Sequence, residues 1–167
     1  MRGTAPRLPA VLPALFLGIA LGCGGGAKPA PKPPDPTTEE QAARSPVVSW
    51  DILAREPVTN ESDVKHILIG WSDLQGSGDA RAAARNQAQA EQEVTAILEK
   101  LKAGGNFEEA MAAHSEDQGS ASSGVSFHVS PSASLVIEFK QLGSRLAVDE
   151  IGVCQSQFGF HIIKRVK

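Results

Sequence analysis

Four histidines are the side chains of this sequence best suited to acid–base chemistry or metal binding near neutral pH: His66, His114, His128 and His161. Two of them, His66 and His161, each lie inside an apolar pattern typical of a β-strand, HILI and HII. If these strands are neighbours in a small sheet, the two imidazoles meet and can share a proton through complementary tautomers. The pattern alone leaves open whether such a pair is catalytic or stabilises the core.

Other kinds of chemistry find little support in the sequence. No two histidines have the i,i+4 or H-x-H spacing of metal ligands, so we expect no metal site. The motifs G-x-S-x-G and H-E-x-x-H and a glycine-rich phosphate loop are all missing from the sequence, so we expect no hydrolase, nucleotide or cofactor chemistry. Cys154 lies in an apolar, strand-like stretch and is expected to be a small buried hydrophobe, not a nucleophile.

Composition separates the two ends of the chain. The 167 residues leave room for one modest domain. Most of the prolines fall in the first sixty residues, whereas the periodic apolar residues that can build a core fall in the last hundred. The formal net charge is -3, with no cluster of Lys and Arg, so nucleic acid is not an expected partner.

The first 22 residues have the features of a secretory signal peptide. Arg2 and Arg7 precede an apolar run, VLPALFLGIALG, that is too short to span a membrane comfortably. The run ends in Ala20-Leu21-Gly22-Cys23, which resembles a bacterial lipobox, although Ala20 stands where Leu is usual. We therefore expect cleavage before Cys23 and lipidation of its thiol, which would anchor the chain in a membrane. An ordinary secreted protein with an incidental cysteine is the alternative.

The stretch from residue 23 to residue 60 is predicted to be a tether. Residues 24–45 are rich in Gly, Pro and charge and cannot bury enough apolar surface to fold, so we expect a flexible spacer. The more apolar stretch 46–57 is expected to touch the folded domain through Trp50. The resemblance to bacterial lipoproteins implies, from Gly24 directly after the expected lipidation site, a location in the outer membrane with the domain facing the periplasm.

Residues 61–167 are predicted to form one α+β domain. Alternation in the stretch 63–71 places Val64 and His66 on one face of a strand and Ile67 and Ile69 on the other. Asp79 is predicted to cap a helix at about 80–103, Asn106 is predicted to cap a second helix that follows it, and apolar spacing predicts a third helix at 135–146. The later strands are predicted at 125–129 and in the two halves of 150–167, which gives the order β-α-α-β-α-β-β. This order favours one small antiparallel sheet.

Three stretches in this domain resemble the signature sequences of parvulin-type peptidyl-prolyl cis/trans isomerases: VKHILI, KLKAGGNFEEAMAAHSEDQGSA and EIGVCQSQFGFHIIK. They occur in the family's order and spacing over residues 62–167. The resemblance implies a sheet of about four strands covered by helices, and isomerase activity on X-Pro bonds. It also implies that His66 and His161 are the paired active-site histidines. Asp117 falls at a position that parvulins fill with Cys or Asp.

The resemblance also identifies residues for substrate binding. Phe127, Leu135 and Phe139 fall on apolar positions that hold the proline ring, and Ser156 and Phe158 fall on positions that line the same cleft. For Phe127, plain core packing is the alternative. The expected substrates are unfolded or partly folded polypeptides that contain proline, and a monomer is expected.

Two sequence features bear on how the activity would work. The family usually carries a strand GGDLGWF after the catalytic loop, but residues 124–130 read GVSFHVS. This departure leaves open a non-catalytic peptide-binding module or chaperone with the same fold. The loop WSDLQGSGDA carries Asp73 and Asp79 and no Lys or Arg, so we expect no requirement for phosphate before proline. With Asp at 117, covalent attack on the substrate is not expected.

Overall fold

A computed structural model describes residues 44–74 and 78–167 of the chain. The expected signal peptide, the lipidation site Cys23 and the tether up to residue 43 lie outside the described residues. The described part is an α+β domain with the predicted order of its main elements, so the predicted fold class is confirmed.

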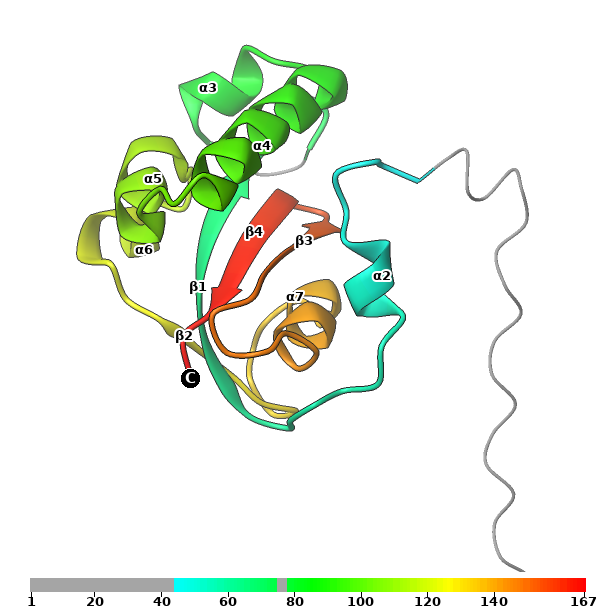
Figure 1. Cartoon of the computed structure of the whole chain (residues 1–167). Coiled ribbons are helices and arrows are strands. Elements are labelled where there is room, and N and C mark those ends of the chain that lie inside the picture. The colour runs from blue at the N-terminus through cyan, green and yellow to red at the C-terminus, as the bar shows by residue number, and fades with distance from the viewer. Residues whose placement is uncertain (1–43, 75–77) are drawn as a thin grey trace, which may run out of the picture. The chain divides into compact units, whose positions relative to one another are not determined.

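The centre of the domain is a four-stranded antiparallel sheet (Figure 1). Its strands are β1 (Ser62–Ile69), β2 (Phe127–Val129), β3 (Ile151–Ser156) and β4 (Gly159–Arg165), in the spatial order β2-β1-β4-β3. The first and last strands of the domain are therefore neighbours in the middle of the sheet. The two histidines were expected to meet if their strands were neighbours, and β1 and β4 are neighbours.

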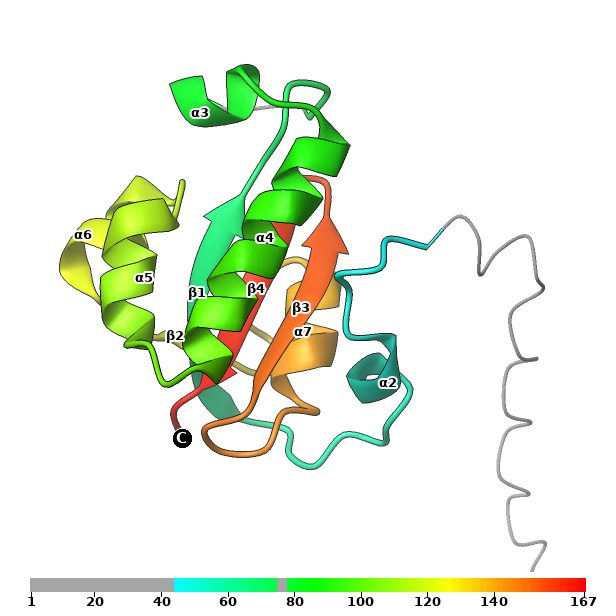
Figure 2. The ribbon, with the colours of Figure 1, turned by 45° about the horizontal axis from the view of Figure 1, so that its top comes forward.

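Helices cover both faces of the sheet (Figure 2). The helices α4 (Gln87–Lys102) and α5 (Phe107–His114) pack on one face, and α2 (Trp50–Leu53) and α7 (Ile137–Gly143) pack on the other. Two short helices, α3 (Ala80–Ala83) and α6 (Gln118–Ser123), flank the loops at one end of the sheet. None of the helices in the described ranges has the length and apolar character needed to cross a membrane.

The prediction of a single helix over 80–103 was wrong, because a second helix begins after the N-cap residue Asn86. The Asn86 side chain accepts a hydrogen bond from the backbone N–H of Gln89 (3.0 Å), and the Gln89 side chain accepts one from the backbone N–H of Asn86 (2.8 Å). This reciprocal capping box opens α4 and separates it from α3. The predicted caps Asp79 and Asn106 are both confirmed.

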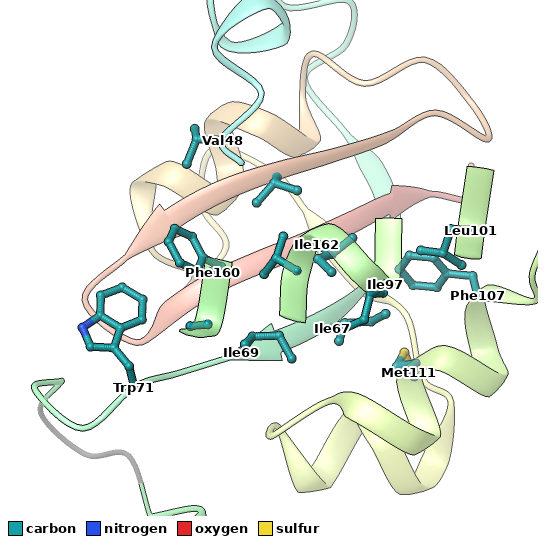
Figure 3. Packing of buried hydrophobic residues seen from close by; sticks show 13 residues of the cluster. Val48, Ile67, Ile69, Trp71, Ile97, Leu101, Phe107, Met111, Phe160 and Ile162 are labelled. Atoms are coloured by element: carbon teal, nitrogen blue, oxygen red, sulfur yellow. The ribbon is translucent and has the colours of Figure 1, made fainter. Parts of the chain in front are cut away.

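Alternation along β1 distributes its side chains between two apolar clusters. Ile67 and Ile69 face the cluster under α4 and α5, where Val94, Ile97 and Met111 pack against them (Figure 3). Because β-strand side chains alternate, the residues between them face the other way. The opposite cluster accordingly holds Val64, Phe139, Leu142, Cys154 and Ile163, among others. The predicted burial of Cys154 is confirmed, and burial raises the pKa of its thiol.

The segment before β1 covers the outer edge of β3. The Ser49 backbone N–H donates to Val153 O, and the Val153 N–H donates to Ser49 Oγ, both at 2.9 Å. Val48 and Ile52 are buried against the domain, whereas Trp50 is 39% exposed. The expectation that Trp50 anchors this segment was therefore wrong, since its ring faces outward and the aliphatic residues on either side of it make the contact.

Candidate active site

The two histidines singled out by the sequence lie side by side in the sheet. In the pairing of β1 with β4, Leu68 is opposite His161 and Ile163 is opposite His66, so the two histidines are diagonal neighbours on one face. Their Nδ1 atoms are 3.3 Å apart, and each residue is 5% exposed. The antiparallel register thus brings together two imidazoles that are 95 positions apart in the chain.

Asp117 reaches the same pair from the loop between α5 and α6. Its Oδ2 atom lies 2.9 Å from His66 Nε2 and accepts a hydrogen bond from Ser120 Oγ at 2.7 Å. Ser120 is buried and its hydroxyl also lies 3.3 Å from His66 Nε2. Ser120 was not among the predicted site residues, although its position three residues after Asp117, in the first turn of a helix, is the signal that could have identified it.

The polar contacts at the pair fix which ring nitrogens carry hydrogen. An ionised Asp117 can only accept, so His66 donates from Nε2 and its Nδ1 is left as an acceptor. The Nδ1 of His161 must then donate to it, which leaves His161 Nε2 to accept from Ser156 Oγ at 2.8 Å. Ser156 Oγ in turn accepts from the Phe158 backbone N–H at 3.1 Å. The result is one hydrogen-bonded chain with both imidazoles neutral.

The pKa values agree with this assignment. Burial lowers the pKa of His161 to about 3, and the nearby His66 acts in the same direction. Burial also lowers the pKa of His66, with its hydrogen bond to Asp117 acting against the shift. Burial alone would raise the pKa of Asp117, but hydrogen bonds from Ser120 and His66 outweigh it, so this pKa lies below its ordinary value. At neutral pH the site therefore holds two neutral imidazoles and one carboxylate.

Two of the predicted apolar residues, Phe127 and Phe139, pack against the His66 ring. The rings of Phe127 and Phe139 meet the His66 ring edge to face, with centroids 4.9 and 5.3 Å away. Phe139 also packs edge to face on His161, at 5.5 Å. Phe139 is buried, whereas Phe127 and Leu135 are half-buried and pack against the same apolar cluster. Phe127 and Phe139 thus lie against the histidine pair, and Leu135 packs on the cluster that contains Phe139.

A cleft of about 760 Å³ opens onto the two histidines. Asp117 and Phe158 line it together with His66, His161 and residues 78–80 at the start of α3. Of the predicted substrate-binding residues, Phe158 lines this cleft, Ser156 contacts His161 behind it, and the three apolar residues around His66 are not part of its lining. The imidazole of His66 therefore lies between an apolar cluster and an open cleft that carries carboxylates.

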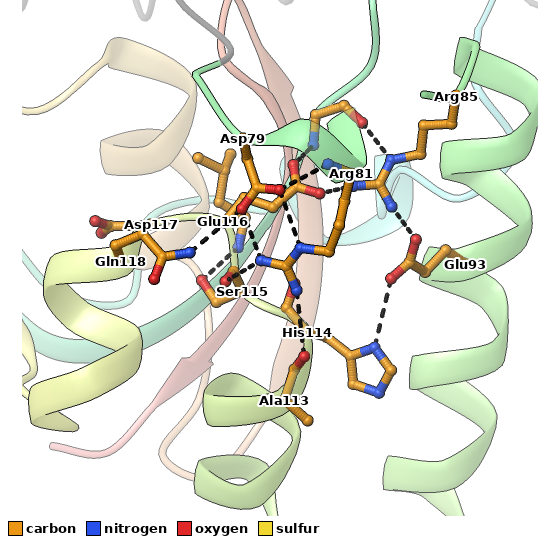
Figure 4. A network of polar contacts seen from close by, with 12 residues as sticks. Asp79, Arg81, Arg85, Glu93, Ala113, His114, Ser115, Glu116, Asp117 and Gln118 are labelled. Atoms are coloured by element: carbon orange, nitrogen blue, oxygen red, sulfur yellow. Dashed lines mark hydrogen bonds and ion pairs between the residues drawn. The ribbon is translucent and has the colours of Figure 1, made fainter. Parts of the chain in front are cut away.

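Two arginines that the sequence analysis did not identify hold the loop that carries Asp117 (Figure 4). Arg81 donates hydrogen bonds to the carbonyl oxygens of Ala113, His114 and Ser115, at 3.3, 3.4 and 3.0 Å. It is oriented by an ion pair with Asp79, at 2.9 Å. Together these contacts tie the start of α3 to the end of α5.

The second arginine, Arg85, forms ion pairs with Glu116 and Glu93. The Glu116 side chain is 4% exposed and also accepts a hydrogen bond from the backbone N–H of Gly70 at 2.7 Å. Arg85 Nε donates to the carbonyl oxygen of Gly70 at 2.8 Å, and the Glu116 N–H donates to Leu68 O at 2.9 Å. The residue directly before Asp117 is thus fixed to the end of β1.

No group of three or more His, Cys, Asp or Glu side chains within 44–74 and 78–167 is arranged to hold a metal ion. What the site does offer is a dry, neutral imidazole pair, one carboxylate and adjacent aromatic rings. Together with the four-stranded sheet and its covering helices, these features define a domain of the parvulin class. The comparison with family models agrees: residues 51–167 match the PPIC-type PPIASE domain. The chain belongs to this family of peptidyl-prolyl isomerase domains.

Individual relatives agree with this membership. The chain is 34% identical over 109 residues to the chaperone SurA of Nitrosospira multiformis, which covers 65% of this chain and 22% of that protein. The matched part of the chain therefore spans less than a quarter of the length of that relative. Among solved structures, TbPIN1 is 25% identical with a TM-score of 0.58, covering 66% of this chain and 100% of TbPIN1. The isomerase ESS1 of Candida albicans has the same fold, at 19% identity and a TM-score of 0.57 over 81% of this chain and 80% of its own.

Proposed function

We propose that this protein catalyses cis/trans isomerisation of X-Pro bonds in extracytoplasmic polypeptides, without a covalent intermediate. The observation that carries the proposal is the contact of His66, His161 and Asp117 beside the rings of Phe127 and Phe139. Membership of the isomerase family supports the same reaction. The residue roles follow from how the reaction works.

Rotation about an X-Pro bond must break the resonance of the amide, with a barrier of about 20 kcal/mol. A turnover of about a hundred per second needs that barrier lowered by roughly 5 kcal/mol, at about 1.4 kcal/mol per factor of ten. Holding the proline ring while the preceding carbonyl swings, in a place from which water is excluded, can supply a contribution of this size. No nucleophile is required.

In the proposed mechanism the proline ring sits against Phe127, Leu135 and Phe139. The twisted amide has lost the polarity of its resonance form, so a dry apolar surface favours it over the planar ground state. The neutral His66–His161 pair supports this surface from the sheet side without introducing a charge. The Asp117 carboxylate orients His66 and sets the electrostatic potential at the carbonyl that rotates.

A protease-coupled assay on Ala-X-Pro-Phe peptides tests the proposal. The full-length chain should accelerate isomerisation of these peptides, and Asp117→Ala should reduce kcat/KM by about tenfold to a hundredfold, because His66 loses its charged partner. Rates equal to the uncatalysed reaction for the wild type would overturn the proposed activity. An Asp117→Ala variant as fast as the wild type would remove Asp117 from the mechanism.

We propose further that the activity does not depend on phosphate before proline. The charged residues that line the cleft are Asp79, Glu116 and Asp117. Within 44–74 and 78–167, no Lys or Arg lines it. A phosphoserine in the cleft would be repelled, since nothing there can form a bidentate contact with it. A higher kcat/KM for a phosphoserine-proline peptide than for its unmodified form would contradict this proposal.

The N-terminal sequence supports a location for the domain. We propose that the chain is cleaved before Cys23, lipidated there and held at the outer membrane as a monomer facing the periplasm. Palmitate labelling of cells that produce the chain tests this: label should be incorporated into the wild type and not into Cys23→Ala. Equal labelling of both, or recovery of the wild type in the soluble periplasmic fraction, would contradict it.

A non-catalytic peptide-binding module is the second candidate function. One observation favours it: Phe139 is buried, and the apolar residues around His66 do not line the open cleft. A protein of this kind would bind proline peptides in the cleft without accelerating their cis/trans isomerisation. The same peptides therefore separate the candidates, because a binder gives chemical-shift changes in an NMR titration without line broadening from cis/trans exchange.

A further inference from the structure

The open cleft beside Asp117 has a charge that the isomerase reaction does not require. Three carboxylates line it, but two of them are neutralised within the protein: Asp79 by Arg81 and Glu116 by Arg85. Asp117 contacts only His66 and Ser120 through its Oδ2 atom, and both of these are uncharged at neutral pH. In the described part of the chain, Asp117 is therefore the carboxylate of the cleft that lacks a cationic partner.

This carboxylate is accessible to a ligand. The Asp117 side chain is 31% exposed, and its hydrogen bonds within 44–74 and 78–167 come from His66 and Ser120, neither of which brings a positive charge at neutral pH. Its pKa lies below the ordinary value, so it is ionised at neutral pH. The same cleft is lined by Phe158, an aromatic residue that is 43% exposed. The cleft thus offers an apolar wall and a free negative charge.

An apolar wall next to a carboxylate suits one kind of side chain. Lys and Arg bury their aliphatic stems on apolar surface and place the charged end beside an anion. An aromatic face adds attraction for the cation. An acidic or phosphorylated side chain would instead meet an ionised carboxylate with no cation in the lining to offset it.

We infer that this cleft recognises a basic residue directly before proline in the substrate. The inference rests on the proposed function, in which Phe127 and Leu135 hold the proline ring on one side of His66. Asp117 contacts the same imidazole through Nε2, where the cleft begins. The carbonyl that rotates belongs to the residue before proline, and the proposed mechanism places this carbonyl beside Asp117, so the side chain of that residue would enter the cleft. Asp117 and Phe158 are then the residues that determine specificity.

The experiment compares three peptides, Ala-Lys-Pro-Phe, Ala-Leu-Pro-Phe and Ala-Glu-Pro-Phe p-nitroanilides, with the full-length chain. We expect kcat/KM to fall in the order Lys, Leu, Glu, with Lys over Glu by about tenfold at low ionic strength. Near 0.5 M salt the ratio should shrink toward one, while the rate for Leu changes little. A ratio within twofold at low salt, or Glu as the best substrate, would overturn the inference.

Variants assign the selectivity to a residue. Asp117→Asn should bring the Lys-to-Glu ratio close to one, whatever its effect on the absolute rate. Asp149→Asn is the matched control: Asp149 is exposed, lies outside the cleft lining and has φ of 67°, which Asn tolerates, so the same change of charge should leave the ratio unaltered. An unchanged ratio in Asp117→Asn, or an equal fall in Asp149→Asn, would refute the assignment.

The outcomes separate this inference from the proposed function. If no peptide is isomerised faster than in buffer, the proposed activity itself is wrong. If all three are isomerised equally fast, the activity stands and the specificity is wrong. If Asp117→Asn is too slow to measure, the salt dependence of the wild-type ratio still decides, because only a charge–charge contact gives a ratio that salt removes.

Discussion

The ion pair between Arg85 and Glu116 gives the sharpest test of how the active-site loop is held. Replacing Arg85 with Met keeps the aliphatic stem but leaves the Glu116 carboxylate, 4% exposed, without its cation. Breaking one side of a buried pair costs about 3–5 kcal/mol, because the remaining charge stays desolvated. A domain of this size is stable by about 5–15 kcal/mol in total, so the variant should lose a large part of its stability.

The substitutions Arg85→Met and Glu116→Gln should destabilise the domain to different extents, because the two residues keep different contacts when their partner is removed. Arg85 also pairs with Glu93, so Glu116→Gln leaves the arginine with one carboxylate and should cost less than Arg85→Met. The double variant Arg85→Met/Glu116→Gln removes both charges of the pair, so neither partner is left buried without its counter-charge. Its loss should therefore be smaller than the sum of the two single losses.

Urea denaturation followed by tryptophan fluorescence measures these differences, because Trp71 is buried in the core under α4. With a slope of about 2 kcal/mol per molar urea, a loss of 4 kcal/mol moves the midpoint by about 2 M. Lys65→Met is the control, since Lys65 pairs with Glu108 at the surface and should cost less than about 1 kcal/mol. A loss of unfolding free energy in Arg85→Met no greater than that in Lys65→Met would refute the proposed role of this ion pair. So would a double variant whose loss equals the sum of the losses in the two single variants.

Three further predictions address the rest of the molecule. Burial, with His66 nearby, lowers the pKa of His161 to about 3. Below about pH 6.5 this residue therefore binds a proton in the unfolded chain but not in the native one. The free energy of unfolding should fall by up to about 5 kcal/mol between pH 6.5 and 3 as a result. His161→Asn should flatten this slope in urea titrations at several pH values, and an unchanged slope would contradict the assignment. Ile52→Ala should cost about 2–4 kcal/mol and Trp50→Ala less than about 1 kcal/mol in the same titrations, and equal losses would refute the packing of the segment before β1. Ser156→Ala should lower kcat/KM about tenfold with little change in Tm, because it removes the donor to His161 Nε2, and a wild-type rate would exclude this role.

Sequence patterns predicted the histidine pair because a strand has a strict period of two. When β1 and β4 are neighbours, alternation allows each histidine side chain only one of the two faces of the sheet. The apolar residues around His66 and His161 in the sequence predict that both side chains are buried, as they are. The capping residues Asp79 and Asn106 were predictable for a similar reason, since a cap depends on contacts within three or four residues.

Contacts between loops distant in the sequence were not predictable in this way. Nothing near Arg81 or Arg85 indicates that their side chains reach residues 113–116, because that depends on where α3 comes to lie relative to α5. Likewise, Phe139 and Phe158 were both expected in one substrate site. Their exposures differ because α7 packs on the sheet, whereas Phe158 projects from the turn between β3 and β4.

The turn that carries Phe158 shows how backbone geometry positions this side of the cleft. Gly159 has φ of 134°, and a Cβ atom at this position would lie 2.4 Å from the carbonyl oxygen of Ile69, so only glycine allows β4 to start this close to β1. The close approach sets the register in which His161 is opposite Leu68. It also directs Ser156 toward His161 Nε2 through the hydrogen bond from the Phe158 backbone N–H. A larger residue at 159 would have to push the strands apart, and it would disturb the imidazole pair and the aromatic wall of the cleft together.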